Sequence, residues 1–148
     1  MQPTKSAGLL KILSVSPLQN DHASLQSIVG RFTWLLLKAD SFPAALAILG
    51  QHDISVVLCE RDLMPGRWAD VLNGLNHLPH PPSLIVTSRL ADDQLWAEAL
   101  NLGTWDVLAK PFDLTEVTRV LSSAWLHWRQ QYCVLTMSQE LMATAAAA

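Results

Sequence analysis

Apolar and polar positions alternate along this chain in two recurring patterns. Nearly continuous apolar runs predict five strands that are covered on both faces, over residues 9–15, 32–39, 54–59, 83–87 and 105–109. After each run, apolar residues recur every three or four positions, which predicts five helices, over residues 20–31, 41–50, 68–78, 92–103 and 113–131. The chain therefore reads as five successive strand–helix units.

Residue types that begin and end helices support several of these boundaries. Asp21 and Ser41 are predicted N-caps, and Asp113 with Glu116 has the spacing of a capping box. Pro43 fits the first turn of the second helix. Three of the helices are predicted to end at a glycine, namely Gly30, Gly50 and Gly103.

Five such units predict an α/β fold, flavodoxin-like (βα)5, with a doubly wound parallel five-stranded sheet and an extended C-terminal helix. Right-handed crossovers put helices on both faces of the sheet. We expect an N-terminal segment over residues 1–8, a domain over 9–129, and a C-terminal helical extension or tail over 130–148. Functional residues are expected beyond the carboxyl ends of the strands, at residues 14–18, 59–66, 87–89 and 109–112.

Composition narrows the classes of function. The 148 residues are 50% hydrophobic, enough for one substantial core, and the formal net charge is −3 without any basic run. This charge pattern predicts no nucleic-acid or anionic-membrane partner. Cys59 and Cys133 lie far apart, and no signal peptide or apolar run of membrane-spanning length is predicted, so we expect a cytoplasmic protein.

The expected loops resemble those of a response-regulator receiver domain, the phosphorelay module of two-component signal transduction. The segments "LIVTSRLADD", "LNLGTWDVLAKPFD" and "DLMPG" carry the resemblance, which covers Lys11 to about Arg129. It implies that Thr87 and Ser88, at the end of the fourth strand, and Lys110-Pro111, at the end of the fifth, match the switch and phosphate-binding positions.

The acidic positions depart from the receiver pattern. The acidic pair that would bind Mg²⁺ falls on Ser16 and Pro17, so Mg²⁺ binding is expected to be weak or absent, and no metal ligands or other cofactors are assigned. Glu60 falls at the phosphoacceptor position, with Arg61 and Asp62 as alternatives that depend on the length of the loop.

The resemblance therefore implies a degenerate, pseudo-receiver-like module. We expect an atypical protein-binding module that signals without phosphorylation, with Glu60 paired to Lys110, and no enzymatic activity beyond residual self-phosphorylation. One alternative is a phosphotransfer-competent receiver with an altered acidic site. A weaker alternative is a flavodoxin-like small-molecule binder that uses Trp68 and Trp105 as an aromatic clamp.

The apolar pattern of the last helix predicts a protein partner. Apolar residues at steps of three and four suggest a coiled-coil seam and a homodimer formed through the fourth and fifth helices. The predicted interface residues are Leu121, Trp125, Trp128, Tyr132 and Leu135. An alternative, which can hold at the same time, is that Leu121 and Trp128 pack this helix on its own sheet while Trp125 and Tyr132 face a partner.

Overall fold

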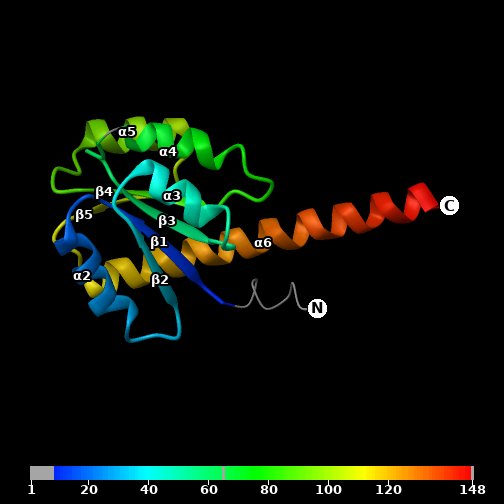
Figure 1. Ribbon diagram of the computed structural model, residues 1–148, viewed down its shortest axis with the longest axis horizontal. Coiled ribbons are helices and arrows are strands. Elements are labelled where there is room, and N and C mark those ends of the chain that lie inside the picture. Colours follow the sequence, from blue (N-terminus) through cyan, green and yellow to red (C-terminus); the bar gives the residue numbers. More distant parts are fainter. Residues whose placement is uncertain (1–8, 65, 148) are drawn as a thin grey trace.

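The predicted parallel sheet is present in the computed structural model, which describes residues 9–64 and 66–147 (Figure 1). Within these residues the strand order is β2-β1-β3-β4-β5, and all paired strands run parallel. The predicted segment 1–8 lies outside the described residues. The elements are β1 (Lys11–Val15), α2 (Gln19–Val29), β2 (Leu35–Ala39), α3 (Phe42–Leu49), β3 (Val56–Glu60), α4 (Trp68–Leu75), β4 (Ser83–Ser88), α5 (Asp93–Leu102), β5 (Asp106–Ala109) and α6 (Leu114–Ala147).

The helices cover both faces of the sheet, as the alternation of side chains along β3 illustrates. Val57 and Cys59 belong to the apolar cluster formed with α3, α4 and α5. Val56 and Leu58 belong to a second cluster, formed with α2 and α6. Because successive strand residues point to opposite faces, one strand that is buried along its whole length supplies both cores. Each aliphatic side chain buried in this way contributes about 1.5–3 kcal/mol.

The second strand is shorter than predicted. β2 begins at Leu35, which pairs with Lys11, the first residue of β1. Residues 31–33 instead form a turn, and Phe32 stacks on Trp34 with ring centroids 4.2 Å apart. Residues 32–34 extend past the end of the neighbouring strand, so they have no ladder to join. The apolar pattern of residues 32–39 could not reveal that β1, the strand with which β2 pairs, begins only at Lys11.

Two of the three predicted N-caps are confirmed. Ser41 Oγ accepts from the Ala44 amide at 3.3 Å, and Asp113 Oδ2 accepts from the Glu116 amide at 2.9 Å. The prediction for Asp21 is wrong, because the N-cap of α2 lies three residues earlier, at Leu18, and makes no side-chain cap hydrogen bond. Asp21 therefore lies inside the first turn of the helix, where its carboxylate is available for another partner.

The predicted extended C-terminal helix is confirmed. α6 is one continuous helix of 34 residues, and its second half leaves the sheet and projects away from the rest of the molecule (Figure 1). Its first half packs on the sheet through Val117, Val120, Leu121 and Ala124. Among the described residues, no helix is both long enough and apolar enough to cross a membrane.

Candidate functional site

A crevice lies at the carboxyl ends of the strands, and Glu60 is the strand residue at its centre. Glu60 is the last residue of β3, pairs in register with Thr87 of β4, and is 5% exposed. Arg61 follows the strand and donates its amide to the Thr87 carbonyl at 2.9 Å, whereas the Asp62 side chain is exposed. Of the three candidate acceptor positions, only Glu60 thus has a buried side chain at the end of the strand.

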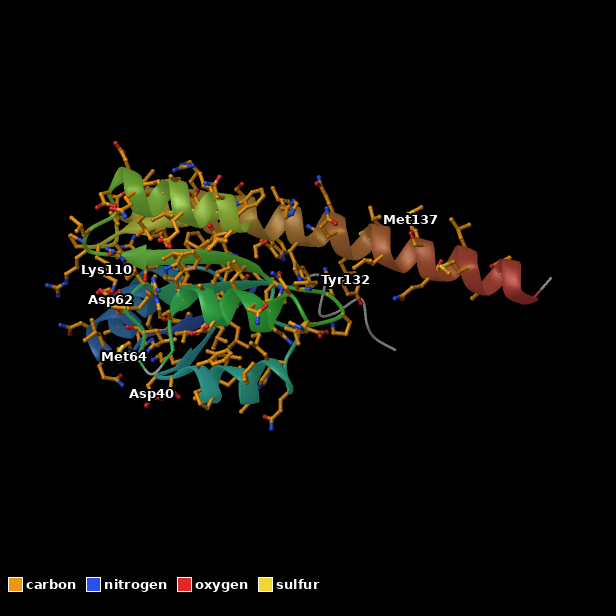
Figure 2. All side chains as sticks on the ribbon, turned by 90° about the horizontal axis from the view of Figure 1, so that it is seen from above. Asp40, Asp62, Met64, Lys110, Tyr132 and Met137 are labelled. Carbon is orange, nitrogen blue, oxygen red and sulfur yellow. The ribbon has the colours of Figure 1, made fainter. Side chains whose placement is uncertain are left out.

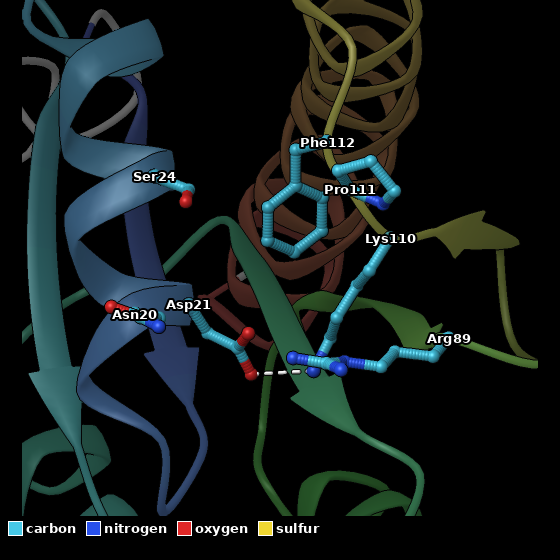
Figure 3. Close-up of a pocket in the computed structure, with 7 residues that line it drawn as sticks. All are labelled: Asn20, Asp21, Ser24, Arg89, Lys110, Pro111 and Phe112. Carbon is cyan, nitrogen blue, oxygen red and sulfur yellow. Dashed lines mark hydrogen bonds and ion pairs between the residues drawn. The ribbon is translucent and has the colours of Figure 1, made fainter.

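Lys110 joins two carboxylates in this crevice. Its Nζ lies 2.5 Å from Asp21 Oδ2 (Figure 3). The same Nζ also donates to Glu60 Oε1. The side chains of Lys110, Asp21 and Glu60 are 6%, 10% and 7% exposed, so the ion pairs are almost completely removed from water. The peptide bond from Lys110 to Pro111 is cis. The structure therefore brings together the predicted Glu60–Lys110 pair and adds Asp21 as a third member.

Further hydrogen bonds hold the two carboxylates in place. Ser16 Oγ donates to Asp21 Oδ2 at 2.6 Å and accepts from the Leu18 amide at 3.1 Å. Glu60 Oε2 accepts from the Asp62 amide at 2.8 Å. Buried carboxylates persist only when their oxygens are paired in this manner. Ser16, at one of the predicted degenerate positions, thus positions the neighbouring acid, while Pro17 is exposed.

His22 is a buried residue of the site that sequence analysis missed. Its Nε2 lies 2.9 Å from the Ser16 carbonyl oxygen, and its Nδ1 lies 2.9 Å from Ser14 Oγ. A carbonyl oxygen can only accept, so Nε2 carries a proton. His22 therefore ties the end of β1 to α2 and fixes the backbone of Ser16, which in turn holds Asp21.

The remaining predicted residues surround Lys110. Thr87 and Ser88 are both buried, and Ser88 Oγ accepts from the Leu90 amide at 3.0 Å. On one side of Lys110 is a cavity of about 350 Å³ whose lining includes Asp21, Arg89 and Pro111 (Figure 3). A second cavity, of about 370 Å³, has a lining that includes Glu60 and Arg61. Lys110 and Arg89 line both cavities.

The donor set does not fit a bound Mg²⁺. Both buried carboxylates already accept from the Lys110 ammonium, which lies between them where a cation would be expected. No cluster of three or more acidic, histidine or cysteine side chains suited to a metal ion occurs within residues 9–64 and 66–147. A divalent cation would have to displace Lys110 before it could bind both acids.

The proposed aromatic clamp is wrong. Trp68 is 1% exposed and belongs to the core beneath α4. Trp105 precedes β5, at the opposite end of the sheet, where its amide donates to the Leu84 carbonyl and its ring stacks on His127. The two rings therefore cannot enclose one ligand at the crevice.

The predicted interface residues separate into three environments. Leu121 and Trp128 are 0% and 3% exposed and pack inside the domain, so their assignment to a partner interface is wrong. Trp125 packs against the core from a half-buried position, and half-buried Tyr132 lies beside the rings of His80 and Trp128. Leu135, at 39% exposure, is the most accessible of the five. The predicted seam faces the molecule itself because α6 uses that side to cover the sheet.

Comparisons with known proteins agree with this architecture. No family model and no curated protein matches the sequence. The structure is similar to a signal receiver domain from Vibrio parahaemolyticus, with a TM-score of 0.78 and 15% identity, covering 85% of this chain and 97% of that one. It is also similar to the signal receiver domain of an HD domain-containing protein from Pseudomonas fluorescens Pf-5, with a TM-score of 0.76 and 22% identity, covering 84% and 92%.

A third similar structure is a CheY-like response regulator receiver domain from Methanospirillum hungatei JF-1, with a TM-score of 0.73 and 16% identity, covering 83% of this chain and 98% of that one. This chain therefore has the fold of response-regulator receiver domains, and each of these domains is matched over nearly its whole length.

Proposed function

We propose that this chain is a receiver domain in two-component signal transduction that binds protein partners without being phosphorylated. The observation that carries the proposal is the Lys110 ammonium between the Asp21 and Glu60 carboxylates. Glu60 stands at the end of β3, the position that the receiver resemblance assigns to the phosphoacceptor. Its negative charge takes the place of the charge that phosphorylation would otherwise add.

A phosphodonor would meet two obstacles in this crevice. One oxygen of Glu60 accepts from Lys110 and the other from the Asp62 amide, and these hydrogen bonds lower the nucleophilicity of the carboxylate toward a phosphoryl group. Phosphoryl transfer also requires cations that neutralise the transferring group. Here the nearest ammonium is shared by two acids, and displacing it would leave buried carboxylates facing each other, which is costly.

Asp21 favours the alternative of a phosphotransfer-competent site. The sequence alone predicted no acid in the crevice at the end of β1. In the structure, the Asp21 carboxylate reaches Lys110 from the first turn of α2. If Lys110 moved aside, Asp21 and Glu60 would offer two carboxylates, as many as Mg²⁺ commonly takes from a protein. This alternative requires a mobile Lys110, whereas the main proposal requires a fixed one.

An amide NMR titration with Mg²⁺ and beryllofluoride separates the two. We expect no saturable shifts at Thr87, Ser88 and Lys110 at millimolar Mg²⁺, because the Lys110 ammonium already pairs with both acids and lies where the cation would bind. Saturable shifts that spread from these residues into α5 and β5 would refute the phosphorylation-independent proposal and establish the alternative.

A pair of variants tests whether the Glu60 charge sets the signalling state. Glu60→Gln should shift the amide signals around Thr87 and weaken binding to the output partner, because Lys110 loses one of its two acids. The matched control is Asp62→Asn, which removes the same charge from an exposed side chain two residues away. Unchanged Thr87 signals and unchanged partner binding in Glu60→Gln would count against the proposal.

The proposed partners are proteins, including a second copy of the chain, in the cytoplasm. One of the structures similar to this chain is the beryllofluoride-activated NtrC4 receiver domain, which is a dimer. The proposed homodimer uses α5 and α6. Exposed leucines on both helices support it, with Leu100 at 48% and Leu126 at 52% exposure.

A further inference from the structure

The second half of α6 is an unusually apolar helix for one that stands away from its domain. Residues 130–147 continue the helix beyond the sheet, as both whole-molecule views show (Figures 1 and 2). Glu140 is the only charged side chain from residue 130 onward. A helix with so few charges normally buries most of its surface, whereas a solvated one carries many.

Three exposed apolar residues form a stripe on this segment. Val134, Met137 and Leu141 are 58%, 62% and 69% exposed, and they follow one another at steps of three and four residues. At about 100° per residue, all three lie within about 60° of one another around the helix axis. We call these three residues the outer stripe.

The outer stripe faces away from the domain. Trp128, which is 3% exposed, marks the side of α6 that packs on the loop before β4, where its ring stacks on His80. Nine residues, or about 900° of rotation, separate Trp128 from Met137, which puts them on opposite sides of the helix. The domain to which α6 belongs therefore cannot cover the outer stripe.

A helical segment of this length that packs on nothing has only marginal stability in water, because most helical stability in proteins comes from packing of an apolar face. We propose that the outer stripe is the contact between two copies of the chain, which pair through the projecting halves of α6. This inference rests on the proposed homodimer and replaces its predicted seam with Val134, Met137 and Leu141.

The absence of basic residues favours a second copy of the chain, rather than an acidic protein or an anionic membrane, as the partner of the outer stripe. The projecting half has no Lys or Arg to attract an acidic protein or an anionic membrane, and interfacial helices typically carry such residues on their polar face. Glu140 lies about 100° from the centre of the outer stripe, so pairing two copies puts no carboxylate into the seam. Steps of three and four residues are also the spacing that two helices need to interlock their side chains.

Sedimentation equilibrium of the full chain, from low to high micromolar concentration, tests the inference. The test variant is Met137→Lys/Leu141→Lys, and the matched control is Ser138→Lys/Gln139→Lys, which adds the same charge to exposed positions of the same turns. Lys favours helix, so both variants should keep α6 intact, which circular dichroism checks. We expect the test variant to weaken dimerisation at least about a hundredfold and the control less than about threefold.

A milder pair of substitutions guards against unfolding of the projecting half. Met137→Ala/Leu141→Ala uses the best helix former and should still weaken dimerisation about tenfold or more. A wild-type chain that stays monomeric throughout would refute both the homodimer and this inference. A wild-type dimer that both double-lysine variants weaken equally, or that the test variant leaves intact, would refute the outer stripe alone and return the interface to the α5–α6 surface.

Discussion

The Lys110 ammonium lies 2.5 Å from the Asp21 carboxylate, although 89 positions separate the two residues in sequence. The contact joins the end of β5 to the first turn of α2 across the crevice. Because Lys110 also binds Glu60, one cation is held by two acids that are themselves nearly buried. Removing the lysine and removing one of the acids should therefore destabilise the fold by different amounts.

We predict that Lys110→Met destabilises the fold more than Glu60→Gln. Loss of Lys110 leaves two buried carboxylates without a cation, at a cost of about 3–5 kcal/mol. Loss of the Glu60 charge leaves Lys110 paired with Asp21, and the expected cost is about 1–3 kcal/mol. Urea denaturation followed by circular dichroism gives the free energies of unfolding.

The triple variant Asp21→Asn/Glu60→Gln/Lys110→Met provides the control for this prediction. It removes all three charges together, so much of the stability lost in Lys110→Met should return. A triple variant no more stable than Lys110→Met would show that packing of the lysine stem, rather than charge, dominates at this position.

Cys59 should be inert to thiol reagents in the folded protein. Burial, together with the nearby negative charge of Glu60, raises the pKa of the Cys59 thiol from 9.0 to about 12, so almost no thiolate forms at neutral pH. The exposed Cys133 serves as the internal comparison. Iodoacetamide followed by mass spectrometry should label one cysteine in the native protein and both in denaturant. Rapid native labelling of Cys59 would contradict the prediction.

The aromatic cluster around His80 should weaken in acid. The His80 ring stacks on Trp128 at 4.3 Å, and burial lowers the pKa of His80 from 6.5, against the opposing effects of a hydrogen bond to the Trp128 backbone and the charge of Asp53. A histidine that is harder to protonate when folded stabilises fully above its unfolded pKa, and this contribution is lost as the pH falls below about 6.5. The melting temperature should therefore drop between about pH 7 and pH 5.

The variant His80→Phe isolates this effect, because it keeps an aromatic ring but cannot be protonated. Its melting temperature should depend less on pH than that of the wild type. His77→Phe, at an exposed position of the same loop, should keep the wild-type pH dependence. Equal pH dependence in the wild type and in His80→Phe would assign the acid sensitivity to other groups.

Two glycines at helix ends should respond oppositely to alanine. Gly103 has φ of 101°, a left-handed conformation that a Cβ disfavours, so Gly103→Ala should cost about 1 kcal/mol even though no atom would touch the new methyl group. Gly50 has φ of −76° and room for a Cβ, so Gly50→Ala should be neutral or stabilise by up to about 1 kcal/mol. Thermal melts of the two variants test this difference in sign.

Local sequence patterns predict most of the helices and strands, but they do not predict contacts between segments that are distant in sequence. Ser41 was predictable as a cap because its partner, the Ala44 amide, is three residues away. The cap assignment of Asp21 is wrong because its partner, Lys110, lies 89 positions away, and no local pattern encodes so distant a contact. Glu60 was found because strand burial fixes which residue ends β3.

The same distinction explains the error in the predicted interface. The steps of three and four residues that include Leu121 and Trp128 identify an apolar face of α6, but they do not say whether the sheet or a second copy covers it. The outer stripe produces an equally regular pattern. Only the docking of the first half of α6 on the sheet separates the two faces.

Because α6 is one continuous helix, its projecting half moves as a rigid extension of the half that packs on the sheet. At about 1.5 Å per residue, residues 130–147 extend α6 by about 27 Å past the sheet. A tilt of only about 10° where α6 leaves the sheet would therefore move the tip sideways by about 5 Å, roughly one helical turn. Small rearrangements under the aromatic rings of His80 and Trp128 would thus be converted into displacements large enough to realign whatever the far end holds.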